Sequence, residues 1–485
     1  MSTFNRSDAW VLAGLAFGVG ALGCDSTPEE TVLTRAQLLD PQTCKTCHPK
    51  HYEQWSGSMH AYAAEDPVFV AMNRRAQEEA QLGDFCVKCH APMAVREGLT
   101  VDGLNLAELP KHLQGVTCYF CHNAVDVTAD HGNPLTLAND NVMRGGISDP
   151  VDPKVHQAAY SEFHDRNSDK SSRMCGACHD FETPQGVFLE RTFAEYRQTL
   201  FATPTSSFDT CQGCHMEGEF GVIANVPGVP ARRHHDHLWP GVDVALSDFP
   251  YRAAMRAAVE ECALRNSIQF FSFEAEGDAL STFVATLETS AGHGQPSGAS
   301  QDRRMWLEIV AYDEADRVVF ESGRLADNES DELLNSSDQA WEFHEEIFDA
   351  EGNPTHMFWE AAPSAAYPTG YIDRALPGAK TPEAGGHSKS ATYRLPLKLP
   401  ARAEFRVRMR PVGFDVLNDL IASGHLAPSI LAEMPTFTIY TATAVWAPGT
   451  QDPRDFTLQP TSFADCERYR CLFDQGPSGD PNACP

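Results

Sequence analysis

Hydrophobic and polar residues alternate with a period of two along several stretches of the second half of the chain. The alternation is most regular at 402–410, where Ala403, Phe405, Val407 and Met409 interleave with charged residues. Similar stretches run over 271–276, 282–288 and 305–311. This period turns one face of a strand toward a core and the other toward water. The pattern predicts half-buried antiparallel strands that together form a β-sandwich.

Helical patterns are fewer. One covers 248–265, and another covers 416–422 and stops at Gly424. Thr192-Phe193-Ala194-Glu195 has the form of a capping box, which predicts a short helix starting there. The segment 123–174 is rich in Gly, Pro, Asn and Asp and is expected to be mostly loop.

The N-terminal end has the pattern of an export signal. Arg6 precedes an apolar run from Ala9 to Leu22 that is too short for a comfortable membrane span. Ala21-Leu22-Gly23-Cys24 is similar to a bacterial lipobox. We expect residues 1–23 to be a lipoprotein-type signal peptide and Cys24 to carry a lipid that anchors the protein to a membrane. Cleavage without lipid is the alternative, and both place the protein in the periplasm or on the cell surface.

One pentapeptide, C-x-x-C-H, occurs five times between Cys44 and His215. Cysteines at i and i+3 of a helical turn face the same way, so both thiols can add to the vinyl groups of one porphyrin. The histidine at i+4 can offer a nitrogen to the iron. A zinc ribbon needs ligands in sets of four, and a redox dithiol gives no reason for the histidine. The pattern predicts five covalently attached haem c groups, bound by Cys44, Cys47, Cys86, Cys89, Cys118, Cys121, Cys175, Cys178, Cys211 and Cys214, with His48, His90, His122, His179 and His215 on iron.

Composition adds limits. The formal net charge of −30 among 485 residues makes nucleic acid an improbable partner. Of the 15 cysteines, Cys262, Cys466, Cys471 and Cys484 remain after the motifs and Cys24, and in an exported protein they suggest two disulfides. A buried free thiol is the alternative for Cys262. The haem region allows only about 39 residues per haem, so the porphyrins must supply much of its core.

The segment after the first motif, Trp55-Ser56-Gly57-Ser58-Met59-His60-Ala61, resembles the multihaem cytochrome c family related to the tetrahaem electron carrier of ammonia oxidisers. The resemblance implies that His60 is a distal haem ligand. His51 is expected to be a surface or packing residue. Further family-like segments imply distal roles for His112, for one of His156 and His164, and for His237 in His237-Leu238-Trp239-Pro240-Gly241.

The resemblance continues into the strand-rich half. His293, in Gly292-His293-Gly294-Gln295-Pro296-Ser297-Gly298, is similar to a segment found in multihaem cytochromes with a C-terminal sandwich. There it would reach a haem iron and clamp the two domains together; a structural loop histidine is the alternative. An asparagine usual upstream is absent here. His356 is a weaker candidate.

The sequence thus predicts a helical, loop-rich pentahaem cytochrome c domain at 41–245, after a linker at 24–40. An antiparallel β-sandwich domain with one helix follows at 246–450, and a Cys-containing tail at 451–485. The expected function is electron transfer through mostly bis-histidine haems, with other redox proteins or quinol-linked electron donors as partners. One alternative is an oxidoreductase in which one haem has an open site for a small nitrogen or sulfur compound. Another is a subunit of an extracellular cytochrome filament.

Overall fold

The structure is a computed structural model. It describes residues 32–151, 155–205, 207–264, 267–275, 282–289, 291–336, 340–363, 371–373, 388–394, 400–446, 455–458, 467–478 and 480. The predicted signal peptide and Cys24 lie outside these residues. Among the described helices, none has both the length and the apolar character needed to cross a membrane.

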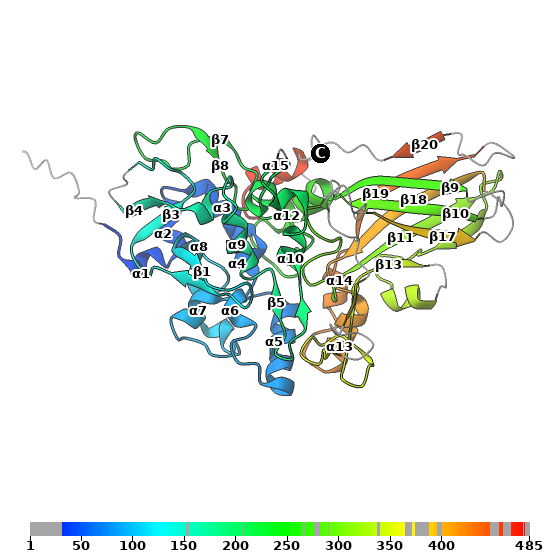
Figure 1. Cartoon of the computed structure of the whole chain (residues 1–485), viewed down its shortest axis with the longest axis horizontal. Coiled ribbons are helices and arrows are strands. Elements are labelled where there is room, and N and C mark those ends of the chain that lie inside the picture. Colours follow the sequence, from blue (N-terminus) through cyan, green and yellow to red (C-terminus); the bar gives the residue numbers. More distant parts are fainter. Residues whose placement is uncertain are drawn as a thin grey trace, which may run out of the picture.

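The first half consists of short helices joined by loops and two-stranded sheets (Figure 1). The helix α5 (Pro67–Ala80) has 14 residues and starts after Asp66, whose carboxylate accepts a hydrogen bond from the Val68 amide. The other helices are α1 (Arg35–Leu38), α2 (Pro41–Lys45), α3 (Pro49–Gly57), α4 (Met59–Tyr62), α6 (Val87–His90), α7 (Pro92–Arg96), α8 (Cys118–His122), α9 (Ser171–Gly176), α10 (Thr192–Tyr196) and α11 (Cys211–His215), with 3-10 turns at Leu106–Glu108, Lys111–Leu113, Glu162–His164 and Leu200–Ala202.

Four strand pairs lie between and after these helices. Two of the pairs lie in the segment 123–174, which was expected to be mostly loop. The Gly- and Asn-rich stretches of this segment form turns and loops that connect its short strands. The pairs are β1 (Ala124–Val127) with β2 (Leu135–Leu137), β3 (Val142–Gly145) with β4 (Gln157–Tyr160) in parallel, β5 (Phe181–Glu182) with β6 (Phe188–Leu189), and β7 (Glu219–Gly221) with β8 (Arg232–His234).

The second half contains the larger sheets, and the prediction of antiparallel strands there is confirmed. A three-stranded sheet has the order β17 (Ser388–Arg394), β10 (Thr282–Thr289), β9 (Ile268–Ala275). A six-stranded sheet has the order β12 (Val318–Ser322), β11 (Arg304–Tyr312), β18 (Arg402–Arg410), β19 (Phe437–Val445), β20 (Asp455–Leu458), with β13 (Trp341–Phe343) also paired to β11. A smaller sheet joins β15 (Pro354–Thr355), β14 (Glu345–Phe348) and β16 (Tyr371–Asp373).

The two larger sheets share one hydrophobic cluster. Ala285 and Leu287 of β10 and Tyr393 of β17 belong to the same buried cluster as Leu307 of β11 and Phe405 of β18. The remaining helices of this half are α12 (Arg252–Ala257), the π-helical turn Ala258–Ala263, the 3-10 helix Asp331–Ser336, α13 (Phe414–Ala422), α14 (Ile430–Glu433) and α15 (Glu467–Asp474). As predicted, α13 stops before Gly424, which has a φ of +80°.

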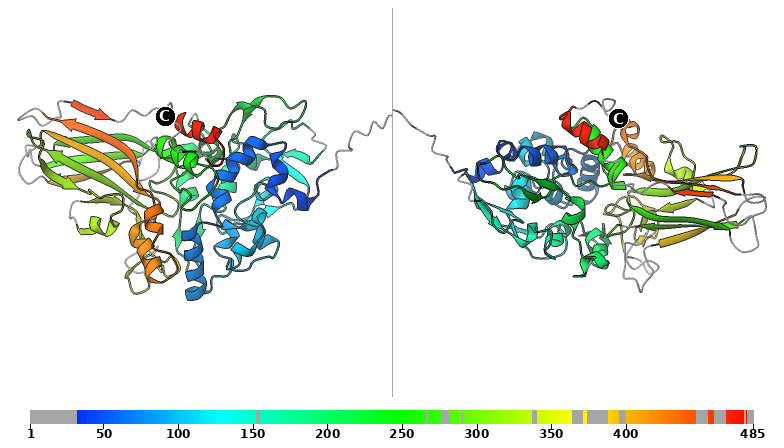
Figure 2. Two further views of the ribbon diagram at one scale, coloured as in Figure 1. Left: turned by 180° about the vertical axis from the view of Figure 1, so that it is seen from behind. Right: turned by 90° about the horizontal axis from the view of Figure 1, so that it is seen from above.

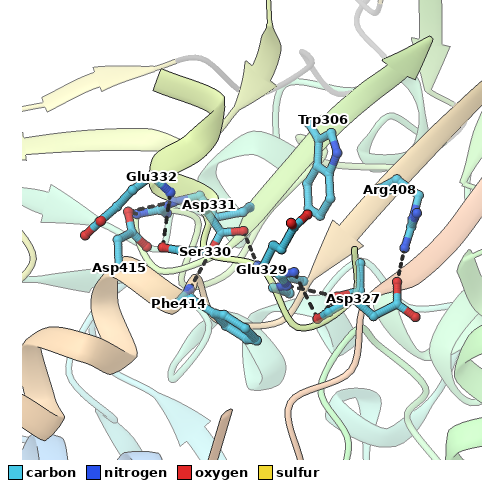
Figure 3. Close-up of polar contacts among 12 residues, drawn as sticks. Trp306, Asp327, Glu329, Ser330, Asp331, Glu332, Arg408, Phe414 and Asp415 are labelled. Carbon is cyan, nitrogen blue, oxygen red and sulfur yellow. Dashed lines mark hydrogen bonds and ion pairs between the residues drawn. The ribbon is translucent and has the colours of Figure 1, made fainter. Parts of the chain in front are cut away.

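Strand β18 differs in one respect from a half-buried strand. Its apolar residues are buried as expected, but Arg408 and Arg410 on the other face are 4% and 0% exposed. Residues of the loop 326–336 cover them, and Arg408 pairs with Asp327 of this loop (Figure 3). Arg408 also pairs with Glu308, and Arg410 pairs with Asp331. The alternation predicted the strand correctly, but it could not show that a distant acidic loop would fold over the charged face.

The two halves lie side by side and touch through α5 and α13 (Figures 1 and 2). Val68 and Ala71 of α5 share a buried cluster with Leu417 and Leu420 of α13. An ion pair between Arg75 and Asp419, at 3.0 Å, lies at the same contact. The second half is therefore packed directly against the part of the chain that holds the C-x-x-C-H motifs.

Candidate functional site

Each C-x-x-C-H motif forms a helical turn. The backbone amide of His48 donates to the Cys44 carbonyl at 2.8 Å, and the amide of His179 donates to the Cys175 carbonyl at 3.0 Å. The third and fifth motifs are the helices α8 and α11 themselves. Two cysteines and the following histidine therefore face the same side of each turn, as attachment of one porphyrin requires.

The cysteines of different motifs lie next to one another. Hydrogen bonds between thiols pair Cys44 with Cys118, Cys89 with Cys178 and Cys175 with Cys211. These contacts raise the pKa of Cys118, Cys178 and Cys175. The charge of Cys121, in the third motif, also raises the pKa of Cys175 and Cys178. The five motifs thus form one connected group.

None of the ten motif cysteines is in a disulfide, and all keep some accessible surface. Desolvation by the surrounding protein nevertheless raises the pKa of Cys86, Cys121 and Cys214 to about 12. His179 likewise has both accessible surface and a shifted pKa. The residue is exposed, yet desolvation lowers the pKa of its imidazole to about 4. A side chain that is surrounded by protein atoms and still has accessible surface lies next to a space inside the protein. Thiols and imidazoles around such space fit haem groups, which bind through these atoms.

The motif histidines are oriented for metal binding. The Nδ1–H groups of His48, His90, His122 and His215 donate to the backbone carbonyls of Ile223, Ala63, Arg144 and Pro240 at 2.8, 3.0, 2.5 and 2.9 Å, respectively. A proton on Nδ1 leaves Nε2 as the nitrogen with a free lone pair. Desolvation also lowers the pKa of all five motif histidines, which favours the neutral imidazole that a metal needs.

Four motif histidines face a second imidazole at a similar distance. The ring centres of His48 and His156 are 6.3 Å apart, those of His60 and His179 are 6.3 Å apart, and those of His215 and His293 are 6.2 Å apart. His122 has two neighbours, His237 at 6.2 Å and His164 at 5.3 Å. His48 also has a second neighbour, His51 of the adjoining helix α3, at 6.1 Å. A metal–nitrogen bond of about 2 Å and about 1.1 Å from nitrogen to ring centre put two axial imidazoles about 6 Å apart across one iron.

The two neighbours of His122 differ in their hydrogen bonds. His164 donates from Nε2 to the Cys121 carbonyl at 2.9 Å. Among the described residues, the buried Nδ1 atoms of His164 and His237 have no hydrogen-bond partner. Desolvation lowers the pKa of His164 to about 3 and holds that of His237 well below its usual range. If His122 binds a haem iron, only one of His164 and His237 can be the second imidazole ligand of that iron.

Three predicted histidines do not take part in these pairs. His112 is half-buried in the 3-10 turn Lys111–Leu113, and in the described part of the chain no ring contact is recorded for it. His90 is stacked face to face on Phe69, with ring centres 3.9 Å apart. Within the described residues His90 has no second imidazole at the spacing of the other four. His356, the weaker candidate, lies against Asp415 and Asp419 of α13 rather than against a motif.

His51 was expected at the surface or in packing and lies among the site histidines. Its ring centre is 4.8 Å from that of His237 and 5.1 Å from that of His234. Desolvation lowers its pKa to about 3. Its spacing of three residues from His48 on a helix was a signal that it shares the face of the motif histidine.

The loop that carries His293 is held by α10. Glu195 accepts hydrogen bonds from the Gly294 amide at 2.9 Å and the Ser297 hydroxyl at 2.7 Å, and the Gly298 amide donates to the Thr192 hydroxyl at 2.9 Å. The capping-box prediction placed the helix correctly but was wrong about these side chains. The N-cap is Arg191, and Thr192 and Glu195 instead bind a loop from the other half.

The disulfide prediction is only partly within the described chain. Cys471 is disulfide-bonded. Cys466, Cys484 and the side chain of Cys262 lie outside the described residues, so their pairing stays a prediction. No group of three or more His, Cys, Asp or Glu among the described side chains has the arrangement of a bare metal-ion site.

Known proteins resemble the chain in sequence and in fold. Residues 43–123 match the family described as cytochrome c554 and c-prime. The solved structure of a penta-heme cytochrome c552 from Thermochromatium tepidum shares the fold with a TM-score of 0.56 and 21% identity, over 84% of this chain and 98% of that one. No curated protein sequence matches the chain. The family match covers residues 43–123, which hold three of the five C-x-x-C-H turns, and the likeness to the solved structure shows a shared fold over most of the chain.

Proposed function

We propose that the protein is a pentahaem electron carrier with haem c attached at all five motifs. One observation supports this most directly: four of the motif histidines each have a second histidine whose ring centre lies about 6 Å from their own. In this assignment His156 is opposite His48, His60 opposite His179, His293 opposite His215, and His164 or His237 opposite His122. An iron with two imidazole ligands has no free position for a substrate and can only exchange electrons.

Contacts between motifs support a continuous path for electrons. The first motif touches the third, the third lies next to the fourth, and the fourth touches both the second and the fifth. Haems attached at adjoining cysteines would lie close to one another. Electrons could then enter at one motif and leave at another.

The second half would serve as a haem clamp. We propose that its two larger sheets form the β-sandwich expected from the alternation, since they share one buried cluster. His293 would connect this half to the haem at Cys211–His215, and Thr192 with Glu195 would fix the His293 loop. Redox proteins or quinol-linked donors would be the partners, and a lipid on Cys24 would hold the protein at a membrane of the bacterial envelope.

Haem stoichiometry and electron paramagnetic resonance of the oxidised protein test this function. The pyridine haemochrome assay should give five haems per chain, and the resonance spectrum should show at least four low-spin irons. Fewer than five haems, or mostly high-spin iron, would contradict the proposal.

A second candidate function rests on His90. Since it lacks a second imidazole within the described chain, the haem at Cys86–His90 is the one most suited to an open site, as in an oxidoreductase acting on a small nitrogen or sulfur compound. A single high-spin signal that disappears on adding nitric oxide or cyanide would favour this candidate. Five low-spin irons would rule it out.

A further inference from the structure

Trp239 contacts two histidines that belong to different haem sites. Its ring centre is 4.6 Å from that of His60, with planes 77° apart, and 5.2 Å from that of His237, with planes also 77° apart. Nearly perpendicular rings at this spacing are in edge-to-face contact. In the proposed ligand assignment, His60 binds the iron opposite His179 and His237 binds the iron opposite His122. One indole would therefore contact the distal ligands of two haems.

These contacts of Trp239 differ from ordinary core packing. In the described part of the chain, its ring contacts are those with the two histidines, and its side chain belongs to none of the buried hydrophobic clusters. The preceding residue, Leu238, is 6% exposed and packs with Tyr251 and Met255 in one of these clusters. The chain thus places Leu238 in a hydrophobic core and Trp239 against the imidazoles.

The backbone on both sides of Trp239 is fixed. The φ of Trp239 is +46°, in the left-handed region, which is uncommon for a bulky residue, and strain of this kind is often found at functional sites. Before it, the His237 amide donates to Oε1 of the buried Gln54 of α3 at 3.0 Å. After it, the Pro240 carbonyl accepts the hydrogen bond from His215 at 2.9 Å. This short segment therefore contacts the proposed ligands of three haems.

His60 is held next to the third motif. Its backbone carbonyl accepts a hydrogen bond from the Val116 amide at 2.8 Å, just before Cys118. A Cβ on Gly115 would lie 2.6 Å from the same carbonyl, so glycine permits this close approach. The backbones of His60 and His237 are thus both tied to neighbouring segments, and the indole of Trp239 contacts the imidazoles of both.

The orientation of an axial imidazole affects the haem that it binds. The plane of the ring determines how its π orbitals overlap with the iron d orbitals, and this overlap changes the g values of a low-spin iron. Residues around the axial ligands also tune the reduction potential. An indole packed against an imidazole limits rotation about the iron–nitrogen bond. Because Trp239 contacts two such imidazoles, its loss would free both rings at once.

We propose that Trp239 is a positioning residue shared by two haems. It fixes the planes of both distal imidazoles, His60 and His237, and thereby sets together the reduction potentials of the haems attached at Cys118–His122 and Cys175–His179. The inference rests on the proposed function for its ligand assignment. The two motifs adjoin each other, so a common control of their potentials would act on one step of the electron path.

Electron paramagnetic resonance of the oxidised holoprotein tests the shared role. The variants His60→Ala and His237→Ala first identify the two signals, because each should remove one low-spin iron. Trp239→Leu should then shift the g values of these two signals together, whereas Trp239→Phe, which keeps an aromatic ring, should leave both close to wild type. Trp341→Leu is the matched control and should shift neither, since this half-buried indole lies against Phe343 in the strand-rich half.

A redox titration of the same variants gives a second readout. In Trp239→Leu the equilibrium constants for reduction of two haems should change about threefold to tenfold, where tenfold corresponds to about 59 mV for a one-electron couple. The other haems should titrate as in wild type. If the leucine variant loses haem, Trp239→Met takes its place and should shift the same two haems.

Three results would overturn the proposal. One is unchanged signals and potentials in a Trp239 variant that keeps its full haem complement. Another is a shift of only one of the two signals. The third is a His237→Ala variant that keeps every low-spin iron, because Trp239 would then contact the ligand of a single haem. Five haems with low-spin iron in the wild type would leave the carrier function intact in each case.

Discussion

The ring centres of His215 and His293 lie 6.2 Å apart with planes 17° from parallel, although the two residues come from different halves of the chain. His215 belongs to α11, and His293 lies in a loop of the strand-rich half. The Nδ1–H of His293 donates to the Gly294 carbonyl at 2.8 Å, which leaves its Nε2 free, as in the motif histidines. This arrangement suits two axial ligands of one iron.

Replacing His293 by alanine should change the spectrum of one haem. We expect His293→Ala to convert one low-spin iron to high-spin, because the axial position opposite His215 loses its ligand. Electron paramagnetic resonance of the oxidised protein measures this. His112→Ala is the matched control and should leave all signals unchanged, since within the described chain no imidazole of a motif lies against His112. Identical spectra for both variants would show that His293 is not a ligand.

The same measurement can show which of the two histidines near His122 is the haem ligand. Only one of His164→Ala and His237→Ala should produce a high-spin iron, because one axial position is available. The 6.2 Å spacing of His237 matches the other three pairs more closely than the 5.3 Å spacing of His164, so we expect the effect in the His237 variant. A high-spin iron in the His164 variant alone would reverse the assignment.

Glu195→Gln should loosen the loop that carries His293. The carboxylate accepts two hydrogen bonds from this loop, and hydrogen bonds to a charged group contribute about 1.5 to 3 kcal/mol each, so a loss of about 2 kcal/mol in the free energy of unfolding is expected. Denaturant unfolding measures the loss. Glu217→Gln is a control, because the side chain of Glu217 is 67% exposed. Equal stabilities of the two variants would contradict the role of Glu195.

The buried pair of Arg410 and Asp331 should matter far more than a surface pair. Their side chains are 0% and 1% exposed, and Asp331 also accepts a hydrogen bond from the Phe414 amide (Figure 3). Asp331→Ala leaves a buried guanidinium unpaired and should cost about 3 to 5 kcal/mol. Glu321→Ala, which breaks the exposed pair with Arg324, should cost at most about 1 kcal/mol. Similar losses in urea unfolding would contradict this difference.

Stability should depend on pH through His356. The hydrogen bond to Asp415 raises the pKa of His356 above its usual value. A raised folded-state pKa adds stability that is fully present below the unfolded pKa, about 6.5, and is lost as the pH rises through the folded-state pKa. His356→Gln should therefore destabilise the protein more at about pH 5.5 than at about pH 8.5. A difference between wild type and variant that grows toward alkaline pH would show the opposite sign.

Sequence patterns predicted the local elements well. The C-x-x-C-H spacing placed the five attachment turns, and period-two alternation placed strands such as β11 and β18 because each pattern reflects neighbours along the chain. They were less informative where a residue binds a distant partner. The side chains of Thr192 and Glu195 hold the 294–298 loop rather than capping their helix, and Arg408 and Arg410 are covered by the 326–336 loop. No local signal records such contacts.

The sequence by itself determined which thiols are spaced for haem attachment, which imidazole follows each pair of thiols, and where strands replace helices. Those features follow from residues within a few positions of one another. Only the tertiary structure decided that His60 faces His179, that His293 faces His215, that His51 lies among the site histidines and that Tyr251 meets Phe473. Each of these pairs joins segments far apart in sequence, and their meeting depends on how buried clusters pack the two halves together.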